Sequence, residues 1–424
     1  MGGRVDTSNA AQFGTLLREA RRRKGLSQAA LGGDKYSGSY ISHLESGRRS
    51  ATPEVVEFLS RRLGVSLLEW GLAPAPASVA PLGNTIEDLL VAERARAEHD
   101  WAAAITHATE AASRAEAVGD TGRHWEALYV VAQAKFSSGE FAEAARRAEV
   151  LSAHEVARRF AVARAQALSL ASVANRASDH LGWAVAYGAR AVEAADTAPP
   201  IILAEALMAL VTAMTEAGHS LVESAPFMRR LTELSPRLTS DHSRGMIAWT
   251  IGSVSFNGGD IEEGIRQHDL AKDLLDRRRD LRMWLRYNST AARWRLNCGI
   301  TEGVDDMLKT ASLGLQILGN NYDVVELRQV EAMYAIRRGE PLEAARIMTE
   351  VLEDPVLGAE GMSRGNSEMV LAHAFRALGQ VEAARRRYEL AALQFEEEGR
   401  LRAAVNAWRR SVGEEVSGDF LTVG

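Results

Sequence analysis

The chain has 424 residues, of which 46% are hydrophobic and 25% are charged, and its formal net charge is −6. This composition is typical of a globular chain with a sizeable core, and the length allows two or three domains. No apolar run approaches the roughly 20 residues of a membrane span, and the first residues lack the basic start and apolar block of a secretion signal. Cys298 is the one cysteine, so it forms no disulfide within the chain, and we expect a reducing, cytoplasmic location.

Charge is unevenly distributed along the chain. Residues 1–70, here called the head, hold 11 Lys and Arg and 7 Asp and Glu, whereas residues 71–424 hold 39 and 49. A basic module on an acidic remainder is typical of a nucleic-acid-binding domain joined to a ligand-sensing one.

Local signals in the head predict five short helices. Apolar residues recur at helical spacing from Phe13 to Ala20, and Gly25 ends that first helix. Residues that favour helix starts open the other four, namely Ser27, Ser37, Thr52 and Ser66. A tight turn separates the second helix from the third, which predicts a helix-turn-helix motif.

Three strings in the head resemble the Cro/repressor (XRE) family of helix-turn-helix regulators. They are LSQAAL at 26–31, SYISHLESGRR at 39–49 and LGVSLLE at 63–69. Two positions depart from the family pattern. Gly32-Gly33 replaces an alanine-containing turn, which we expect to loosen that turn, and Ala51 stands where the family often has proline.

The resemblance implies that the head binds double-stranded DNA. Gln28, at the start of the second helix, is expected to bind a phosphate, as are Arg48 and Arg49 beyond the third helix. The third helix is expected to enter the major groove. Its candidate contacts are Ser37, Gly38, Ser39, Tyr40, Ser42 and His43. Glu45 is expected to bond within the domain, to Arg18.

Plainer interpretations of these side chains stay open: Tyr40 packs on the domain surface, His43 is solvated, and residues 21–24 form a solvated basic face. The third helix carries few long polar side chains, so a single head would bind DNA weakly. A homodimer on a pseudo-palindromic operator is therefore expected.

Residues 71–83 predict a linker, because Pro74, Pro76 and Pro81 disfavour helix and stiffen the segment. Asn84-Thr85 is expected to cap the first helix of the body, residues 84–412, which the tail 413–424 follows.

One pattern recurs eight times in the body with a period of 40 residues. Its anchor positions are Trp101, Phe141, Leu181, Leu221, Ile261, Thr301, Pro341 and Val381. Small residues lie nine positions before each anchor, and mostly small ones three positions after it. Turn-forming or polar residues lie two positions before it, namely His99, Gly139, Asp179, His219, Gly259, Gly299, Gly339 and Gly379. Small columns let two helices approach closely, and the turn column separates them.

These columns resemble the tetratricopeptide (TPR) motif, whose usual period is about 34 residues, with extra residues in each copy. The resemblance implies a TPR-like α-solenoid of about eight helical hairpins, so the whole chain is predicted to be all-α. The segment 401–410 is expected to cap the last hairpin.

In TPR arrays the first helix of each hairpin lines a concave inner wall. The register places four positions on that wall, namely 5, 8, 12 and 15 residues before each anchor, with Asn297 at its rim. The candidate ligand-binding residues are Tyr129, Gln133, Arg176, Trp249, Asn257, Arg286, Arg293 and Asn297. Aromatic, amide and arginine side chains on one wall suit an extended peptide. The alternative is a solvated polar face.

A Cro-like head followed by a TPR body is similar to the Gram-positive peptide-pheromone receptors of quorum sensing, often called the RRNPP group. The resemblance implies a transcriptional regulator whose short-peptide effector binds the concave wall and changes the spacing of two heads. Two alternatives stay open: the body docks a protein partner, or the effector is a small metabolite. A closed apolar pocket would favour a metabolite, and an open groove with an Asn and Arg ladder would favour a peptide.

No phosphate-binding glycine loop, metal-ligand spacing or nucleophile motif stands out in the sequence. We therefore expect no catalytic residue, no metal, no cofactor and no association with a membrane.

Overall fold

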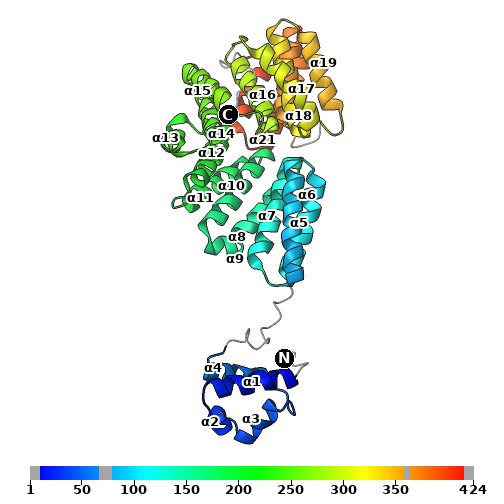
Figure 1. Cartoon of the computed structure of the whole chain (residues 1–424). Helices are drawn as coiled ribbons and strands as arrows, with labels where there is room; N and C mark the ends of the chain where they lie inside the picture. Colours follow the sequence, from blue (N-terminus) through cyan, green and yellow to red (C-terminus); the bar gives the residue numbers. More distant parts are fainter. Residues whose placement is uncertain (1–9, 66–78, 358–362, 415–424) are drawn as a thin grey trace. The chain divides into compact units, whose positions relative to one another are not determined.

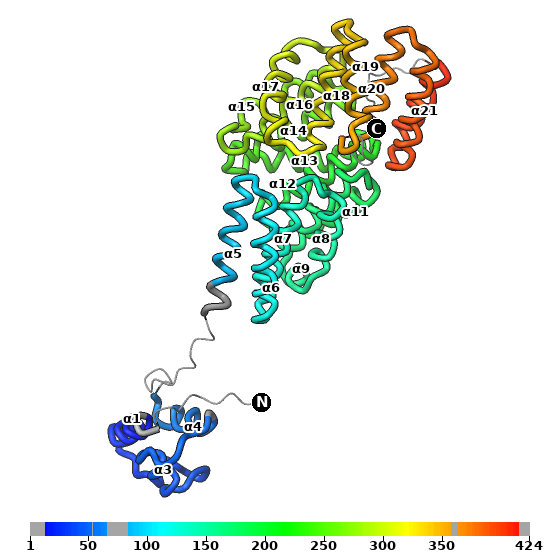
Figure 2. The backbone as a smooth tube through the Cα atoms, turned by 90° about the vertical axis from the view of Figure 1, so that its right-hand side faces the viewer, coloured from blue at the N-terminus to red at the C-terminus, as the bar shows by residue number. Residues whose placement is uncertain are grey.

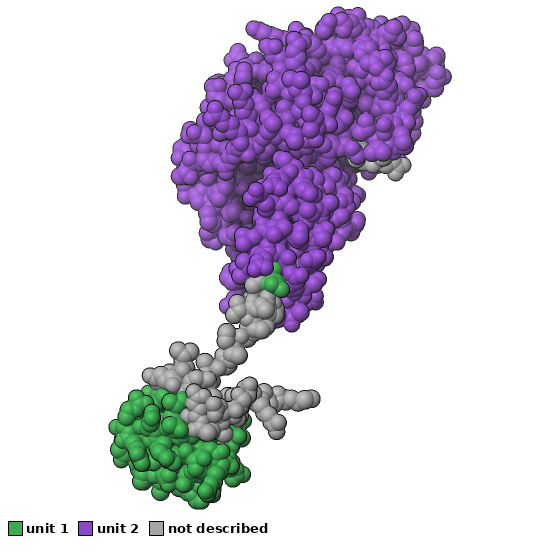
Figure 3. Space-filling model, turned by 45° about the vertical axis from the view of Figure 1, so that its right-hand side comes forward, with its two compact units in different colours: residues 1–84 green, residues 85–424 purple. Residues whose placement is uncertain are grey.

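The computed structural model describes residues 10–65, 79–357 and 363–414 (Figure 1). Helices joined by short turns make up most of these residues, and none of them forms a strand, so the all-α prediction is confirmed. The chain divides into two compact units, Met1–Asn84 and Thr85–Gly424 (Figure 3). The fifth helix predicted at 66–70 lies outside the described residues.

The first unit contains α1 (Ala10–Arg23), α2 (Gln28–Gly32), α3 (Gly38–Glu45) and α4 (Pro53–Leu63). Its core consists of apolar side chains from all four helices. Those without any exposed surface are Leu17, Leu31, Ile41, Leu44 and Leu59. Because Ile41 and Leu44 both come from α3, that helix is fixed to the core along one face.

Serine caps open α2 and α3. The hydroxyl of Ser27 accepts a hydrogen bond from the Ala30 amide at 3.0 Å, and that of Ser37 accepts one from the Tyr40 amide at 3.2 Å. Between the two helices Gly33 adopts φ 57° and ψ −145°, a conformation that is essentially open only to glycine. Glycine at position 33, where the sequence departs from the family pattern, therefore suits the turn that separates α2 from α3.

The described part of the second unit contains eight helical hairpins. Their helices are α5 (Val79–Ala97) and α6 (Trp101–Ala117), α7 (Thr121–Ser138) and α8 (Phe141–Ala153), α10 (Ala161–Ala177) and α11 (Leu181–Ala194), α12 (Pro200–Glu216) and α13 (Leu221–Leu234), α14 (Asp241–Asn257) and α15 (Ile261–Leu274), α16 (Leu281–Asn297) and α17 (Val304–Leu318), α18 (Asn321–Arg337) and α19 (Pro341–Glu353), and α20 (Arg364–Ala377) and α21 (Val381–Glu397). Two short helices, α9 (Glu155–Arg159) and η1 (Ser235–Arg237), lie between hairpins, and α22 (Leu401–Ser411) follows the last one. Successive hairpins lie side by side along the unit (Figure 2).

Helix starts agree closely with the 40-residue repeat. In seven hairpins the second helix begins at the anchor residue, and in the sixth it begins at Val304 instead of Thr301. The first helix, α5, begins at Val79, inside the predicted linker. Proline is tolerated in a first turn because the amide it lacks would have no intrahelical partner there, and Pro81 is the third residue of α5.

The turn column has the left-handed backbone conformation in seven of the eight copies. Glycine fills five of these positions, but His99 at φ 62° and Asp179 at φ 59° adopt the same conformation with side chains. In the fourth copy the left-handed residue is Gly218, one position earlier than His219. The hairpin geometry therefore overrides the residue preference at two turns.

The body also closes on itself across distant hairpins. The carbonyl oxygen of Ser137, at the end of α7, accepts hydrogen bonds from Arg282 Nη1 at 3.0 Å and Asn320 Nδ2 at 3.4 Å. The ring of Phe141 packs edge-on against that of Tyr322, with 5.5 Å between centroids. These contacts join the second hairpin to the sixth and seventh, and so they close one side of the inner wall.

Candidate functional sites

The outward face of α3 is polar. Ser39 and His43 are exposed, and Tyr40 and Ser42 are partly buried, whereas Ile41 and Leu44 on the opposite face are fully buried. Beyond the helix end, Arg48 and Arg49 are exposed. This arrangement presents hydroxyl, imidazole and guanidinium groups outward from one rigid helix.

Glu45 at the end of α3 ties three helices together. Its buried carboxylate accepts hydrogen bonds from Arg21 of α1 at 2.6 and 3.0 Å and from Gln28 of α2 at 2.9 Å. Burial alone would raise the pKa of Glu45, but these bonds outweigh it and leave the pKa below its usual value. Arg18, the partner expected from the sequence, lies 3.6 Å away. Arg21 is the closer partner, although the sequence placed it in a solvated basic face.

Several candidate DNA-contacting residues already have partners within the head. The amide of Gln28 donates to Glu45, and the hydroxyl of Ser37 caps α3. Tyr40 stacks on Tyr36 at 5.4 Å, and the guanidinium of Arg49 lies 5.1 Å from the centroid of the Tyr40 ring. Tyr40 therefore contributes to packing as well as to the outward face.

A cavity of about 310 Å³ lies inside the body. The first helices of six consecutive hairpins, α7, α10, α12, α14, α16 and α18, supply its walls. Its lining residues are Phe136, Val173, Arg176, Thr212, Thr215, Glu216, Met246, Trp249, Thr250, Ser253, Val254, Met283, Arg286, Thr290, Arg293, Trp294, Tyr322 and Glu326. Four of the predicted ligand-binding residues, Arg176, Trp249, Arg286 and Arg293, thus meet at one cavity.

Each arginine of this cavity faces a carboxylate. Arg176 lies 2.6 Å from Glu216, and Arg293 lies 3.1 Å from Glu326. Burial favours the neutral form of Arg176, but Glu216 outweighs it and the net pKa of Arg176 is raised. Burial, followed by the charge of Glu326, raises the pKa of Tyr322 well above its usual value, so this phenol is a neutral hydrogen-bonding group.

The other four predicted ligand-binding residues do not line this cavity. Tyr129 stacks on Trp125 at 5.1 Å, and burial raises its pKa, which hydrogen bonding to Gln133 partly offsets. Asn257 and Asn297 are the last residues of α14 and α16. The side-chain amide of Asn297 is buried, and neither its nitrogen nor its oxygen has a hydrogen-bond partner among the described residues.

The sequence analysis did not name the carboxylates and the phenol of the cavity. Glu216 lies five positions before its anchor and Glu326 lies fifteen before, so both occupy columns that the register had already placed on the inner wall. Tyr322 lies nineteen positions before its anchor, one turn beyond those columns. Extending the register by one helical turn would have found it.

A second chamber, of about 520 Å³, adjoins the first. The two share the lining residues Phe136, Arg176, Met283, Arg286 and Tyr322. The second chamber adds several arginines, among them Arg278, Arg279 and Arg282. Asp323 holds two of the arginines in place, since it lies 2.6 Å from Arg282 and 2.9 Å from Arg286.

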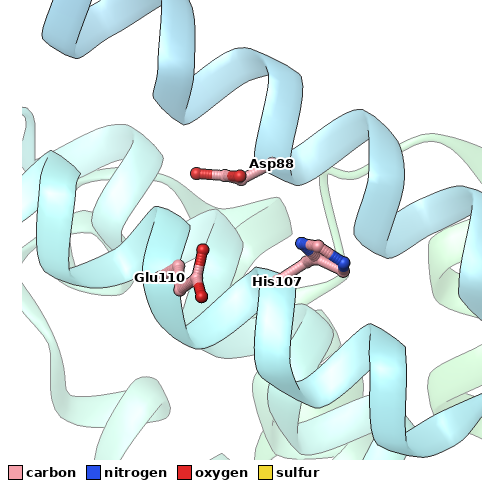
Figure 4. Close-up of side chains that lie close together, drawn as sticks. All are labelled: Asp88, His107 and Glu110. Carbon is pink, nitrogen blue, oxygen red and sulfur yellow. The ribbon is translucent and has the colours of Figure 1, made fainter.

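One cluster elsewhere has the residue types of a metal site. Asp88 of α5 lies near His107 and Glu110 of α6 (Figure 4), and one ligand atom from each falls within 4.8 Å of the others. Arg114, however, forms an ion pair with Asp88 and lies 3.5 Å from Glu110. Because a guanidinium already supplies positive charge between these carboxylates, we assign no metal to the cluster.

Comparison with known proteins places the head within a described family. A family model of a helix-turn-helix domain, HTH_31, matches residues 12–69. No curated protein sequence matches the chain.

The solved structures that are similar to the chain include two proteins bound to other molecules. A Rap protein complexed with Competence and Sporulation Factor has 9% sequence identity and a TM-score of 0.57, over 92% of this chain and 99% of that one. PlcR of Bacillus thuringiensis, in complex with the peptide PapR7 and DNA, has 11% identity and a TM-score of 0.34, over 73% of this chain and 95% of that one. The likeness to Rap shows a shared helical-repeat fold. In the described part of the chain, no helix has both the length and the apolar character to cross a membrane.

Proposed function

We propose that this chain is a ligand-responsive transcriptional regulator that binds a DNA operator through its head as a homodimer. One observation carries the proposal: a helix-turn-helix domain, with a polar face on its third helix, shares a chain with a helical-repeat body that encloses a lined cavity. The first part suits DNA, and the second suits an effector.

In the DNA-binding role, α3 enters the major groove. Ser39, Ser42 and His43 face the base edges, together with the exposed part of Tyr40 and the backbone at Gly38. Gln28, Ser37, Arg48 and Arg49 contact phosphates on either side. Two heads on the two halves of a pseudo-palindrome supply the affinity that one short helix lacks.

In the sensing role, an effector binds on the inner wall of the body. It can change operator affinity only to the extent that it prefers one body conformation over another. The contacts of Ser137 with Arg282 and Asn320 are a physical basis for two such conformations, because they join hairpins far apart in sequence at the wall of the second chamber. A short peptide and a small metabolite are both candidate effectors. The first chamber is enclosed by six helices, which suits a metabolite, and the second chamber is larger, which leaves room for part of a peptide.

The test is a footprint of the purified full chain on the DNA upstream of its own gene, with and without cell extract fractionated by size. We expect protection of a two-fold symmetric site whose half-sites lie about one DNA turn apart. We also expect one fraction of the extract to change that protection. No protection under any condition would refute the proposed function. Protection that no fraction alters would refute the sensing role and leave the DNA-binding role.

A further inference from the structure

The two adjoining chambers differ in charge. Six arginines and two aspartates line the second chamber: Arg96, Arg176, Arg278, Arg279, Arg282 and Arg286, with Asp280 and Asp323. Glu93 and Glu216, just outside the lining, pair with Arg96 and Arg176 and reduce the excess of four positive charges to two. This basic chamber belongs to a stretch of chain that is acidic overall, with 39 basic and 49 acidic residues over 71–424.

The unbalanced positive charge of the second chamber lies at Arg278, Arg279, Arg282 and Arg286. Asp323 alone serves both Arg282 and Arg286, so two guanidinium groups share one carboxylate. Arg279 donates to the hydroxyl of Ser240 at 2.7 Å. Neither Arg278 nor Arg279 forms an ion pair with any described residue. Arginine recognises carboxylates through paired N–H groups, so this group of arginines suits a carboxylate ligand.

The inner chamber is different, because each of its three arginines lies beside a carboxylate. Arg176 and Arg293 each have their own glutamate, and Arg286 shares Asp323 with Arg282. The uncharged part of the wall combines threonine and serine hydroxyls with aromatic and thioether side chains from Phe136, Trp249, Trp294, Met246 and Met283. The aromatic and thioether part of this wall favours an uncharged, apolar group.

Two buried donors on the inner wall have no partner. The Nε atoms of Arg176 and Arg293 are buried and make no hydrogen bond with any described residue. Buried polar groups are satisfied in the great majority of native structures. Both atoms belong to side chains that line the inner chamber, so a carbonyl or ether oxygen of a bound molecule would satisfy them.

We propose that the two chambers form one site for a carboxylate that is joined to an apolar or aromatic body. The carboxylate binds at Arg278, Arg279, Arg282 and Arg286, and the body enters the inner chamber against Trp249 and Trp294. This inference rests on the proposed sensing role and specifies its effector chemistry. The chemistry has two sources: the free C-terminus of a short peptide that ends in an apolar residue, or a small organic acid.

The test uses two matched pairs of probes with the purified full chain. One pair is acetyl-Leu-Phe with a free carboxylate and the same compound as its carboxamide. The other pair is 4-phenylbutyrate and 4-phenylbutyramide. Isothermal titration is expected to show that at least one acid binds about tenfold or more tightly than its amide, because the charged hydrogen bonds to arginine are lost in the amide. The acid that binds identifies the source.

Matched variants locate the site. Arg278→Gln with Arg279→Gln is expected to remove the preference for the acid, because both side chains line the basic chamber and neither has an ion pair to lose. Arg277→Gln is the control, since Arg277 is an exposed neighbour that does not line that chamber. The inference is overturned if no acid binds, if acid and amide bind equally, or if the control loses the preference as the double variant does.

The footprint separates this inference from the proposed function. If operator protection responds to an extract fraction but the acids do not bind, the effector chemistry is wrong and the sensing role stands. If no operator is protected under any condition, the proposed function fails whatever the probes do.

Discussion

Glu45 fixes the position of α3 in the head through one buried charge. It lies on α3, and its partners Arg21 and Gln28 come from α1 and α2. Breaking such a pair leaves an uncompensated buried charge, which costs about 3–5 kcal/mol. The family resemblance implied that Glu45 bonds within the domain. It could not rank Arg18 against Arg21, since both lie on α1 and only the packing angle of α1 brings one closer.

Variants at His43 and Tyr40 should distinguish base recognition from packing within the head. His43 is exposed, so His43→Ala is expected to leave stability within about 0.5 kcal/mol and to weaken operator binding by about 1–3 kcal/mol through loss of a base contact. Tyr40→Ala should also destabilise the head, because it removes the stack on Tyr36 and the contact with Arg49. Gel shifts with operator and random DNA measure the reading, and hydrogen exchange of residues 10–65 measures the packing. An unchanged ratio of operator to random binding in both variants would show that α3 does not read bases.

His268 should make the body sensitive to acid. Its ring is fully buried between Ser253, Phe256 and Tyr287, and burial, followed by the charge of Arg295, lowers its pKa to about 3. An unfolded histidine takes up a proton near pH 6.5, so the folded state loses stability as pH falls below that value, and nothing changes above it. At pH 5 the loss is about 2 kcal/mol.

The pH effect is measured by urea unfolding of the full chain at pH 7.5 and pH 5, with His268→Gln as the comparison. The variant has no imidazole to protonate, so the natural chain should lose about 2 kcal/mol more than the variant between the two pH values. Equal losses would place the acid sensitivity in other groups.

At the scale of elements, the hairpins were predictable because the repeat is local. The anchors, the small columns and the turn column each report on contacts between helices that adjoin in sequence. Ser172 illustrates the close approach, because its hydroxyl donates directly to the carbonyl of Ala184 on the next helix at 2.7 Å. The left-handed turns at His99 and Asp179 were not predictable from residue type, since neither residue favours that conformation as glycine does.

Two glycines of the head should respond oppositely to alanine. A Cβ atom at Gly14 of α1 would lie 2.5 Å from the carbonyl oxygen of Leu44 and 2.8 Å from that of Glu45, and a backbone cannot move aside cheaply. At Gly32 the nearest atom would lie 3.5 Å away, which is ordinary contact. Gly14→Ala is therefore expected to destabilise the head by about 1–3 kcal/mol, whereas Gly32→Ala should be neutral or stabilise it by up to about 1 kcal/mol. Hydrogen exchange of α1 and α3 in the full chain checks both. Equal protection in the two variants would contradict the close packing of α1 on α3.

At the scale of the whole molecule, sequence reasoning found the two parts of the chain but not the closed body. The register placed Arg176, Trp249, Arg286 and Arg293 on the inner wall, and all four line one cavity. The basic chamber depends on Arg282 meeting Ser137, which is 145 residues away, and no local pattern encodes that meeting. The repeat register predicts the direction in which each side chain points. Closure of the body depends instead on the small rotation between successive hairpins, which accumulates along the array.

A terminal repeat needs a polar outer face for solubility. The outer face of α22, the last helix of the body, is instead apolar. Leu401, Val405, Trp408 and Val412 form a stripe at helical spacing and are 36–74% exposed. Glu396 lies beside this stripe and accepts a hydrogen bond from Trp408, and Arg409 follows Trp408 on the helix and pairs with Glu414 at 2.7 Å. A second copy of this chain would bury the apolar stripe, as the proposed homodimer requires.

Leu401→Asp with Val405→Asp is expected to give a monomer, because two carboxylates would be buried at the apolar contact. Sedimentation equilibrium should show the change in mass, with helix content unchanged by circular dichroism. Operator affinity should fall by more than about tenfold, since each head then binds alone, while the weak binding to random DNA persists. The matched control is Leu313→Asp with Ile317→Asp on α17, an equally spaced pair that is 80% and 79% exposed. If the α22 variant is still a dimer and the α17 variant is a monomer, the interface lies on α17 instead. Loss of the dimer on removing residues 415–424 alone would assign the contact to that segment instead.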